Sequence, residues 1–319
     1  MDVAMARTIL APRAVPRLRR ADGGAEFAAG VDYEWVPGTR LLVLTPGSRI
    51  PWREEADLLP PPGTPDSIMG SRDGKRHLLY GEEHFFHDQQ VLATYEPTEE
   101  WSGPVPSADL TGLARTLTRL RARQPVKVVL LGDSISTGAN ASGTVDAPPR
   151  LPAYHDQVVA GLKQRFGGPI TLCNLSVGGM SAPWGAEQLP RAIAEASDLF
   201  IIAFGMNDAS GRCTPGAFGA LVDRMRREVQ AARPQCDVIV VSTMTANPEW
   251  CYAAPALYPA YRNVLLGLRQ PGVAVADVTT IWSWLAARKH YLDLSGNGVN
   301  HPNDFGHRVY AETILALFG

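Results

Sequence analysis

The sequence predicts an α/β protein in two parts, on three observations. Five short apolar runs alternate with stretches of helical periodicity from residue 126 onward. Before about residue 120, short extended runs are separated by Gly, Pro and Asp, and helical periodicity is scarce. At 319 residues, the chain is also long for one domain. We therefore expect an all-β domain over residues 1–120 and an α/β domain over residues 121–319.

The first 120 residues have the pattern of a small antiparallel β-sandwich or jelly roll. Turn residues separate the extended runs, which read YEWVPG, RLLVLTPG, RHLLYGEEHFFH and QVLATYEP. The proline-rich stretch DLLPPPGTPDS, residues 58–67, is expected to be a loop. A helix over residues 107–124 is expected to join the two domains.

The chain after residue 126 alternates strands with helices. Strands that are apolar throughout are typical of a parallel sheet covered on both faces. The expected strands cover residues 126–131, 170–175, 199–205, 238–243 and 273–278. Helices are expected near residues 151–166, 184–196, 215–232, 255–269 and 280–290, and from about 303. Five such units predict a flavodoxin-like α/β/α sandwich with a five-stranded parallel sheet.

Composition excludes several function classes. The formal net charge of −2 gives no electrostatic attraction to nucleic acid or to an anionic membrane. No run of 18 apolar residues is present to span a bilayer. The first 20 residues lack the apolar core of a signal peptide, so we expect none in this chain. A cytoplasmic protein and a trimmed secreted one both remain open, and so does the oligomeric state.

Metal and cofactor chemistry is not indicated. None of the four cysteines lies in a C-x-x-C pair, although Cys213 and Cys251 both fall in loops and could form a disulfide. His84 and His87 have the His-x-x-His spacing, but residues i and i+3 of a strand point to opposite faces. We expect that strand to pack against the α/β domain or to lend polar residues to its cleft. Nucleotide-binding glycine motifs are also absent, so we expect no cofactor.

Candidate catalytic residues follow the carboxyl ends of the expected strands, where open α/β sheets place their sites. Ser134 lies in Gly-Asp-Ser after the first strand, and Gly179 lies in a glycine-rich turn after the second. Asn207 follows the third strand, and His301 precedes the last helix. Singly, Ser134 could be a helix N-cap and the others ordinary turn residues. Together they offer the hydroxyl, the base and the oxyanion donors that serine ester chemistry needs.

These segments resemble the four blocks of the SGNH (GDSL-type) hydrolase superfamily, in the same order, over about residues 125–319. The resemblance implies that Ser134 is the nucleophile and that its own N–H is one oxyanion donor. Gly179, five residues after Asn174, would give a second N–H, and Asn207 would give a side-chain donor. His301 would be the general base and then the general acid.

The sequence departs from the family at the acid that orients the histidine. The family usually has an aspartate three residues before the histidine, and that position is Gly298 here, with Asn297 beside it. One hypothesis is a Ser–His pair whose histidine is oriented by a backbone carbonyl or by Asn297. The other is a carboxylate from Asp293, Asp304 or another loop.

The resemblance predicts a carboxylic ester hydrolase that removes short acyl groups, acetyl first, from carbohydrates or small esters. A β-sandwich before an SGNH domain resembles the layout of some carbohydrate esterases. Trp184 and Trp250 fall in loops on the catalytic rim, where they could stack on a sugar, line an acyl pocket or simply pack. An O-acyltransferase acting on a glycan hydroxyl and a catalytically inactive glycan-binding module are the alternatives.

Overall fold

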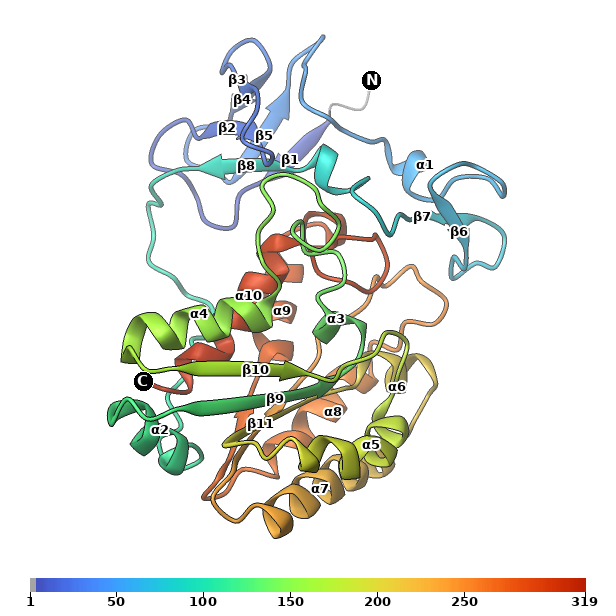
Figure 1. Ribbon diagram of the computed structural model, residues 1–319. Coiled ribbons are helices and arrows are strands. Elements are labelled where there is room, and N and C mark those ends of the chain that lie inside the picture. The colour runs from blue at the N-terminus through green and yellow to red at the C-terminus, as the bar shows by residue number, and fades with distance from the viewer. Residues whose placement is uncertain (1–3) are drawn as a thin grey trace.

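The computed structural model describes residues 4–319 and has two parts that differ in sheet type (Figure 1). The strands of the N-terminal part pair antiparallel, whereas five later strands form one parallel sheet. The first three residues of the predicted N-terminal domain, and of the segment searched for a signal peptide, lie outside the described residues. The predicted fold class, an α/β/α sandwich preceded by a smaller antiparallel-sheet domain, is confirmed.

The parallel sheet has the strand order β10-β9-β11-β12-β13. Its strands are β9 (Val126–Gly132), β10 (Ile170–Asn174), β11 (Leu199–Ala203), β12 (Asp237–Val241) and β13 (Val273–Ala276). Strands β11, β12 and β13 are buried at every residue, which is why the sequence reads there as apolar runs without alternation. The chain runs outward from β9 in both directions, so the switch in strand order lies between β9 and β11.

Helices cover both faces of this sheet (Figure 1). Helices α4 and α10 pack together on one face, and α5 packs on α7 on the other. The helices are α2 (Ala114–Arg121), α3 (Ser134–Thr137), α4 (Tyr154–Phe166), α5 (Ala182–Ala194), α6 (Met206–Ser210), α7 (Pro215–Ala232), α8 (Leu257–Leu266), α9 (Val278–Ala286) and α10 (Asp304–Ala316), with a 3-10 turn η2 (Tyr291–Asp293). Thr214 caps α7 by accepting the N–H of Ala217, and Pro215 opens its first turn, so that helix begins where its sequence signals place it.

The expected connecting helix over 107–124 is shorter in the structure. Helix α2 spans only Ala114–Arg121, because Asp109 closes a turn before it by accepting the N–H of Gly112. Its residues Leu117 and Leu120 are buried in the core of the α/β part. The domain boundary at residue 120 stays a prediction.

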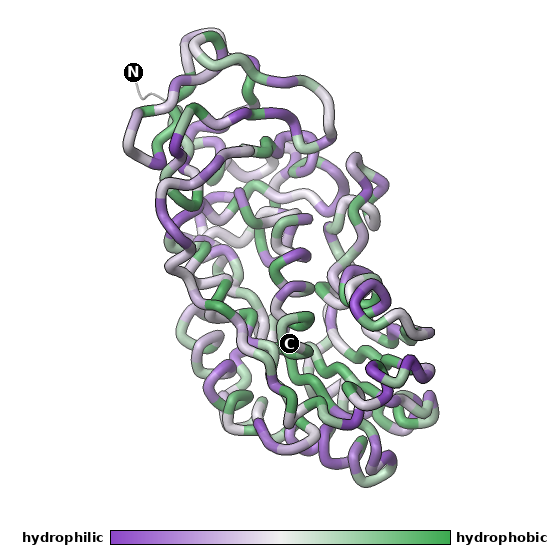
Figure 2. Tube along the Cα trace, turned by 90° about the vertical axis from the view of Figure 1, so that its left-hand side faces the viewer, coloured by the Kyte–Doolittle hydropathy of each residue, from purple (hydrophilic) through white to green (hydrophobic). Residues whose placement is uncertain are grey.

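The N-terminal part contains three small antiparallel sheets, in the orders β1-β5-β4, β3-β2-β8 and β6-β7. Their strands are β1 (Met5–Arg7), β2 (Arg17–Arg20), β3 (Glu26–Phe27), β4 (Tyr33–Trp35), β5 (Leu41–Leu44), β6 (Ser67–Met69), β7 (His77–Leu79) and β8 (Val91–Thr94), with the short helix α1 (Glu55–Leu58) and a 3-10 turn η1 (His87–Gln89). A small core lies between them, formed by Leu18, Phe27, Tyr33, Leu42 and Ile50. Hydrophobic stretches are densest in the α/β part, around its strands (Figure 2).

The strand expected through residues 76–87 is wrong beyond Leu79. Strand β7 ends there, and the following residues form an irregular segment up to His87, which begins η1. The N–H of Tyr80 still bonds to Asp66 beside β6, but the backbone groups of Gly81 and Glu82 bond to the α/β part. The N–H of Gly81 donates to the carbonyl of Asn297, for example, at 3.3 Å. A contact with another domain has therefore replaced strand pairing in this segment.

Cys213 and Cys251 are free thiols, so the disulfide considered from the sequence does not form. No helix among residues 4–319 is both long enough and apolar enough to cross a membrane.

Candidate active site

The Gly-Asp-Ser segment turns the end of β9 into α3, and each residue has a structural reason to be there. A Cβ on Gly132 would lie 2.6 Å from the carbonyl oxygen of Ala203 on the neighbouring strand. Asp133 caps α3, since its carboxylate accepts the N–H of Ile135 at 3.0 Å. Burial raises the pKa of Asp133 to about 7. Ser134 is the first residue of α3, so its N–H has no acceptor within the helix.

Ser134 and His301 meet at the carboxyl end of the sheet. The Nε2 atom of His301 lies 2.9 Å from Oγ of Ser134, and each residue is only 8% exposed. Asn297 shapes the loop before α10 that carries His301, because its Oδ1 accepts the N–H groups of Val299, Asn300 and His301. The contact has the geometry required of a general base and its nucleophile.

The other ring nitrogen of His301 contacts Asn140, a residue that sequence reasoning did not identify. Nδ1 lies 2.7 Å from Oδ1 of Asn140. The amide nitrogen of Asn140 donates to the backbone carbonyl of Glu82 at 2.9 Å, so Oδ1 is the atom that faces the ring. An acceptor at that place requires the proton on Nδ1, which leaves the lone pair of Nε2 toward Ser134. Asn140 thus selects the tautomer that can accept the serine proton.

A carboxylate of the N-terminal part also reaches the ring. Oε2 of Glu82, in the segment after β7, lies 3.4 Å from Nδ1 of His301. Burial by itself would raise the pKa of Glu82. Its hydrogen bond and attraction to His301, together with bonds from Tyr80 and Asn297, outweigh that effect and lower the pKa to about 2. The carboxyl group is therefore ionised beside the imidazole at every pH near neutrality.

The acids considered from the sequence lie elsewhere. Asp293 is paired with Lys289 at 2.9 Å, and Asp304 accepts the N–H of Ser142 at 2.7 Å. Asn297 binds the backbone of its own loop and not the ring of His301. Glu82 carries no motif and belongs to the other domain, so no local signal marked it. Asn140 had one signal, since it follows the Gly-Asp-Ser segment closely, within a run of small residues.

The candidate oxyanion donors lie on three separate turns. Gly178 and Gly179 follow β10, and a Cβ on Gly178 would lie 3.8 Å from Cβ of Ser134. Gly179 has a φ of +78°, a conformation suited to glycine, and nothing lies within 4 Å of where its side chain would be. Asn207 is the second residue of α6, and one N–H of its amide donates to the carbonyl of Met180. Since a side-chain amide has two N–H donors, the second is available to a substrate.

The remaining histidines do not form a metal site. His84 is exposed and pairs with Asp88, while His87 is buried and donates from Nε2 to the carbonyl of Asn140. No cluster of three metal-ligating side chains occurs within residues 4–319. His307, within the last helix, is fully buried, and its ring accepts the N–H of Tyr154 and donates to the carbonyl of Ala139.

The two tryptophans named from the sequence have different surroundings. Trp184 is half-buried and packs edge-on against Phe204. Trp250 packs on the N-terminal part beside Gly70 and lies edge-on to Tyr252, which is 56% exposed. An aromatic surface therefore exists in the loop after β12, on the same edge of the sheet as Ser134.

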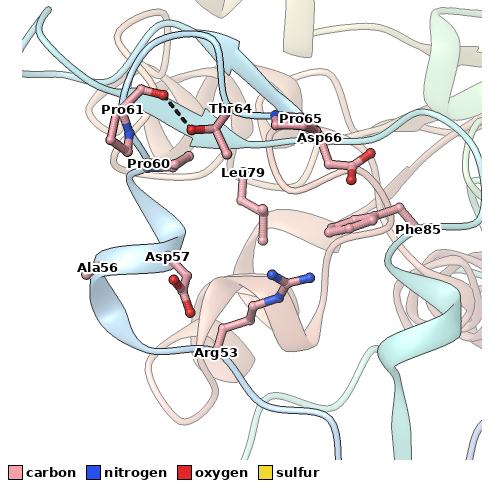
Figure 3. Close-up of a pocket in the computed structure, with 10 residues that line it drawn as sticks. All are labelled: Arg53, Ala56, Asp57, Pro60, Pro61, Thr64, Pro65, Asp66, Leu79 and Phe85. Carbon is pink, nitrogen blue, oxygen red and sulfur yellow. Dashed lines mark hydrogen bonds between the residues drawn. The ribbon is translucent and has the colours of Figure 1, made fainter.

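A cavity of about 210 Å³ lies within the N-terminal part (Figure 3). In Figure 3, the side chains of Leu79, Arg53 and Phe85 point toward its middle. None of Ser134, Gly179, Asn207 or His301 lines it, so it is separate from the candidate active site.

Comparison with known proteins identifies the α/β part. Residues 130–309 match the model of the GDSL-like lipase/acylhydrolase family. No curated protein matches the chain. Among solved structures, a two-domain esterase active on acetylated mannans, co-crystallised with mannopentaose, is 24% identical over 66% of this chain and 53% of that one, with a TM-score of 0.52. A catalytic mutant of an acetylxylan esterase from Geobacillus stearothermophilus is 17% identical over 61% of this chain and 94% of that one, with a TM-score of 0.50.

These structural likenesses show a shared fold, and the chain spans about half the length of the mannan esterase. The family match is the stronger finding, since it covers more than half of the chain and includes Ser134, Gly179, Asn207 and His301. The resemblance to the SGNH superfamily is thereby confirmed. The chain belongs to the GDSL-like lipase/acylhydrolase family.

Proposed function

We propose that this protein hydrolyses esters of short acyl groups, acetyl first, on carbohydrates, through an acyl-enzyme on Ser134. One observation carries the proposal. His301 lies 2.9 Å from the hydroxyl of Ser134, in the tautomer fixed by Asn140, at the carboxyl edge of the sheet and within the residues that match the family. Neither a metal nor a cofactor is required for such a reaction.

In the first half of the reaction, Oγ of Ser134 attacks the ester carbonyl while Nε2 of His301 takes its proton. The carbonyl oxygen becomes an oxyanion, and the N–H groups of Ser134 and Gly179 and the amide of Asn207 donate to it. His301 then gives its proton to the leaving alcohol, and the acyl-enzyme forms.

In the second half, His301 takes a proton from water, and the resulting hydroxide attacks the acyl-enzyme. The carboxylic acid leaves as His301 returns the proton to Ser134. If a sugar hydroxyl replaced water in this step, the product would be a new ester, which is the transferase alternative.

Carbohydrate is the preferred substrate class for two reasons. The solved structures of similar fold include esterases described as active on acetylated mannans and on acetylxylan. The exposed ring of Tyr252 and the adjoining Trp250 also provide an aromatic surface on the catalytic edge, of the kind on which sugar rings stack.

The proposal is tested with p-nitrophenyl acetate and with acetylated mannan and xylan oligosaccharides. Replacing Ser134 or His301 by Ala is expected to lower kcat by at least about 10³-fold. Without either residue, only the oxyanion donors and substrate binding still accelerate the reaction. His290→Ala is the matched control, since His290 is exposed and caps only η2. Its activity is expected to equal that of the wild type.

Different outcomes would favour different functions. If the wild type turns over no short acyl ester faster than Ser134→Ala does, the esterase proposal is contradicted. The inactive glycan-binding module is then the remaining alternative. Acyl transfer to an added glycan faster than hydrolysis would favour the transferase. Equal activity of Ser134→Ala and wild type would remove Ser134 from the mechanism.

A further inference from the structure

We infer that the N-terminal domain supplies the acidic member of the catalytic group, with Glu82 as the carboxylate that faces His301. This inference rests on the proposed function, and it makes the N-terminal domain part of the active site. Glu82 would act through His301 and not on the substrate, so it is a positioning residue.

The negative charge of Glu82 stabilises the ring of His301 when the ring is protonated during the reaction. When His301 takes the proton of Ser134, the ring becomes positive, and Oε2 of Glu82 lies 3.4 Å from its Nδ1. Asn140 is the direct hydrogen-bond partner of Nδ1, but an amide cannot offset a full positive charge. The ionised carboxylate supplies the charge that Asn140 lacks.

The same segment of the N-terminal domain holds Asn140 in place. The backbone carbonyl of Glu82 accepts from the amide nitrogen of Asn140, and Nε2 of His87 donates to the backbone carbonyl of Asn140 at 3.0 Å. Asn140 has a φ of +58°, a left-handed conformation that asparagine adopts more readily than most residues other than glycine. The segment thus fixes both the position of Asn140 and the orientation of its amide.

Gly298 explains why the acid comes from this direction. It occupies the place where the family usually has its aspartate, and a Cβ there would overlap the carbonyl oxygen of Leu79 and lie 2.6 Å from the ring of Phe86. A side chain at residue 298 is therefore incompatible with the docked segment 79–86. The segment takes the space of the missing aspartate, and its own Glu82 reaches the histidine from there.

The expected effect of Glu82 on kcat depends on how far its side chain is exposed to water. The side chain of Glu82 is 49% exposed, so water screens its attraction to the ring. A buried orienting aspartate has an effect of about 10⁴-fold on kcat, part of which comes from fixing the tautomer. Asn140 fixes the tautomer here, so we expect loss of the Glu82 charge to lower kcat by about tenfold.

The test compares Glu82→Gln, Glu82→Asp and Glu83→Gln with the wild type. Two rates are measured: turnover of p-nitrophenyl acetate, and covalent labelling of Ser134 by a fluorophosphonate, which needs the serine and its base but no natural substrate. Glu82→Gln is expected to lower kcat and the labelling rate about tenfold with KM unchanged. Glu82→Asp, which keeps the charge, is expected to recover at least about threefold of that loss. Glu83 is an exposed neighbour, and its variant is expected to match the wild type.

The two rates separate this inference from the proposed function. Wild-type rates of both kinds in Glu82→Gln, or no gain in Glu82→Asp, would overturn the inference while the esterase stands. If no ester is turned over but labelling follows the expected order, the inference stands and the proposed substrate class fails. Thermal melting checks that the variants fold. If Glu82→Gln does not fold, Glu82→Ala removes the same carboxylate and keeps the backbone carbonyl that binds Asn140, and an unchanged labelling rate there would also overturn the inference.

Discussion

At the scale of single residues, two histidines bind the backbone at residues 139 and 140, and a third contacts the side chain of Asn140. His87 donates to the carbonyl of Asn140, and His307 donates to the carbonyl of Ala139. His301 contacts the side chain of Asn140. Each buried ring satisfies a polar group that would otherwise be costly to bury. The position of residues 139 and 140 therefore depends on these rings, and His307 is the one most deeply buried.

His307 makes folding sensitive to acid. Burial, followed by the influence of His155, His301 and His87, lowers the pKa of His307 to about 3. An unfolded chain protonates this histidine near its ordinary pKa of about 6.5, so below that pH the unfolded state binds the extra proton. The stability that His307 contributes is complete above about pH 6.5 and is lost progressively as the pH falls toward 3.

We predict that His307→Gln reduces this sensitivity, since glutamine does not titrate and can still donate to Ala139. The melting temperatures of wild type and variant should be measured between pH 7.5 and 4.5. The excess stability of the wild type at pH 7.5 is expected to shrink steadily as the pH falls. A constant difference across that range would show that His307 does not titrate as its burial requires.

At the scale of elements, the candidate active site combines the carboxyl ends of several strands of the α/β part with one segment of the N-terminal part. Ser134, Gly179 and Asn207 follow β9, β10 and β11, and His301 precedes α10. The turns with Ser134, Gly179 and Asn207 belong to the α/β part alone. The loop with Gly298 and His301, and the turn with Asn140, also contact the N-terminal segment that packs against them.

We predict that Gly298→Ala separates that segment from the loop. The new methyl group would overlap Leu79 and Phe86, and the φ of +84° at residue 298 disfavours any side chain. The segment would move away together with Glu82, and kcat is expected to fall about tenfold or more, as for Glu82→Gln.

The control for this change is Gly216→Ala in α7, where nothing lies within 4 Å of the added methyl group. The activity of this variant is expected to be unchanged. Its stability is expected to rise slightly, since the helix propensity of alanine exceeds that of glycine by about 1 kcal/mol. Full activity of Gly298→Ala would show that the docked segment is not needed.

At the scale of the whole molecule, two cores of unequal size are joined by backbone hydrogen bonds. The N–H of Arg72 donates to the carbonyl of Glu249 at 2.8 Å, and the N–H of Cys251 donates to the carbonyl of Gly70 at 2.7 Å. The α/β part has an extensive core, whereas the core of the N-terminal sheets is small. A small core gives little stability of its own, so the N-terminal domain is the weaker partner.

We predict that Leu42→Ala, in the small core, impairs catalysis from a distance. Removing a buried leucine costs about 2–5 kcal/mol, which is comparable to what a small core supplies. Activity should therefore fall while circular dichroism still reports the helices of the α/β part. Leu92→Ala is the control, because Leu92 is 42% exposed on β8. Equal activity of Leu42→Ala and wild type would argue against a catalytic role of the N-terminal domain.

Much of the fold could be predicted from the sequence because its signals are local. The helix expected at 215–232 has a capping threonine and a proline at its start, and α7 has those bounds. The strands expected at 126–131 and 199–205 are largely apolar runs, and β9 and β11 lie there. The prediction of a strand through His87 was wrong. Gly81 and His87 donate hydrogen bonds to Asn297 and Asn140, which lie far away in the sequence, so no local pattern indicates these contacts.

By itself, the sequence determined the parallel sheet, the four segments at its carboxyl edge and the family, since apolar periodicity and short motifs are properties of neighbouring residues. It also showed that the usual acid is absent at Gly298. Only the tertiary structure decided what faces His301, because Asn140 and Glu82 reach the ring through contacts between segments that are far apart in the chain. The carboxylate of Glu82 acts on Nδ1 of His301 through space over 3.4 Å, and that distance cannot be read from the order of residues in the chain.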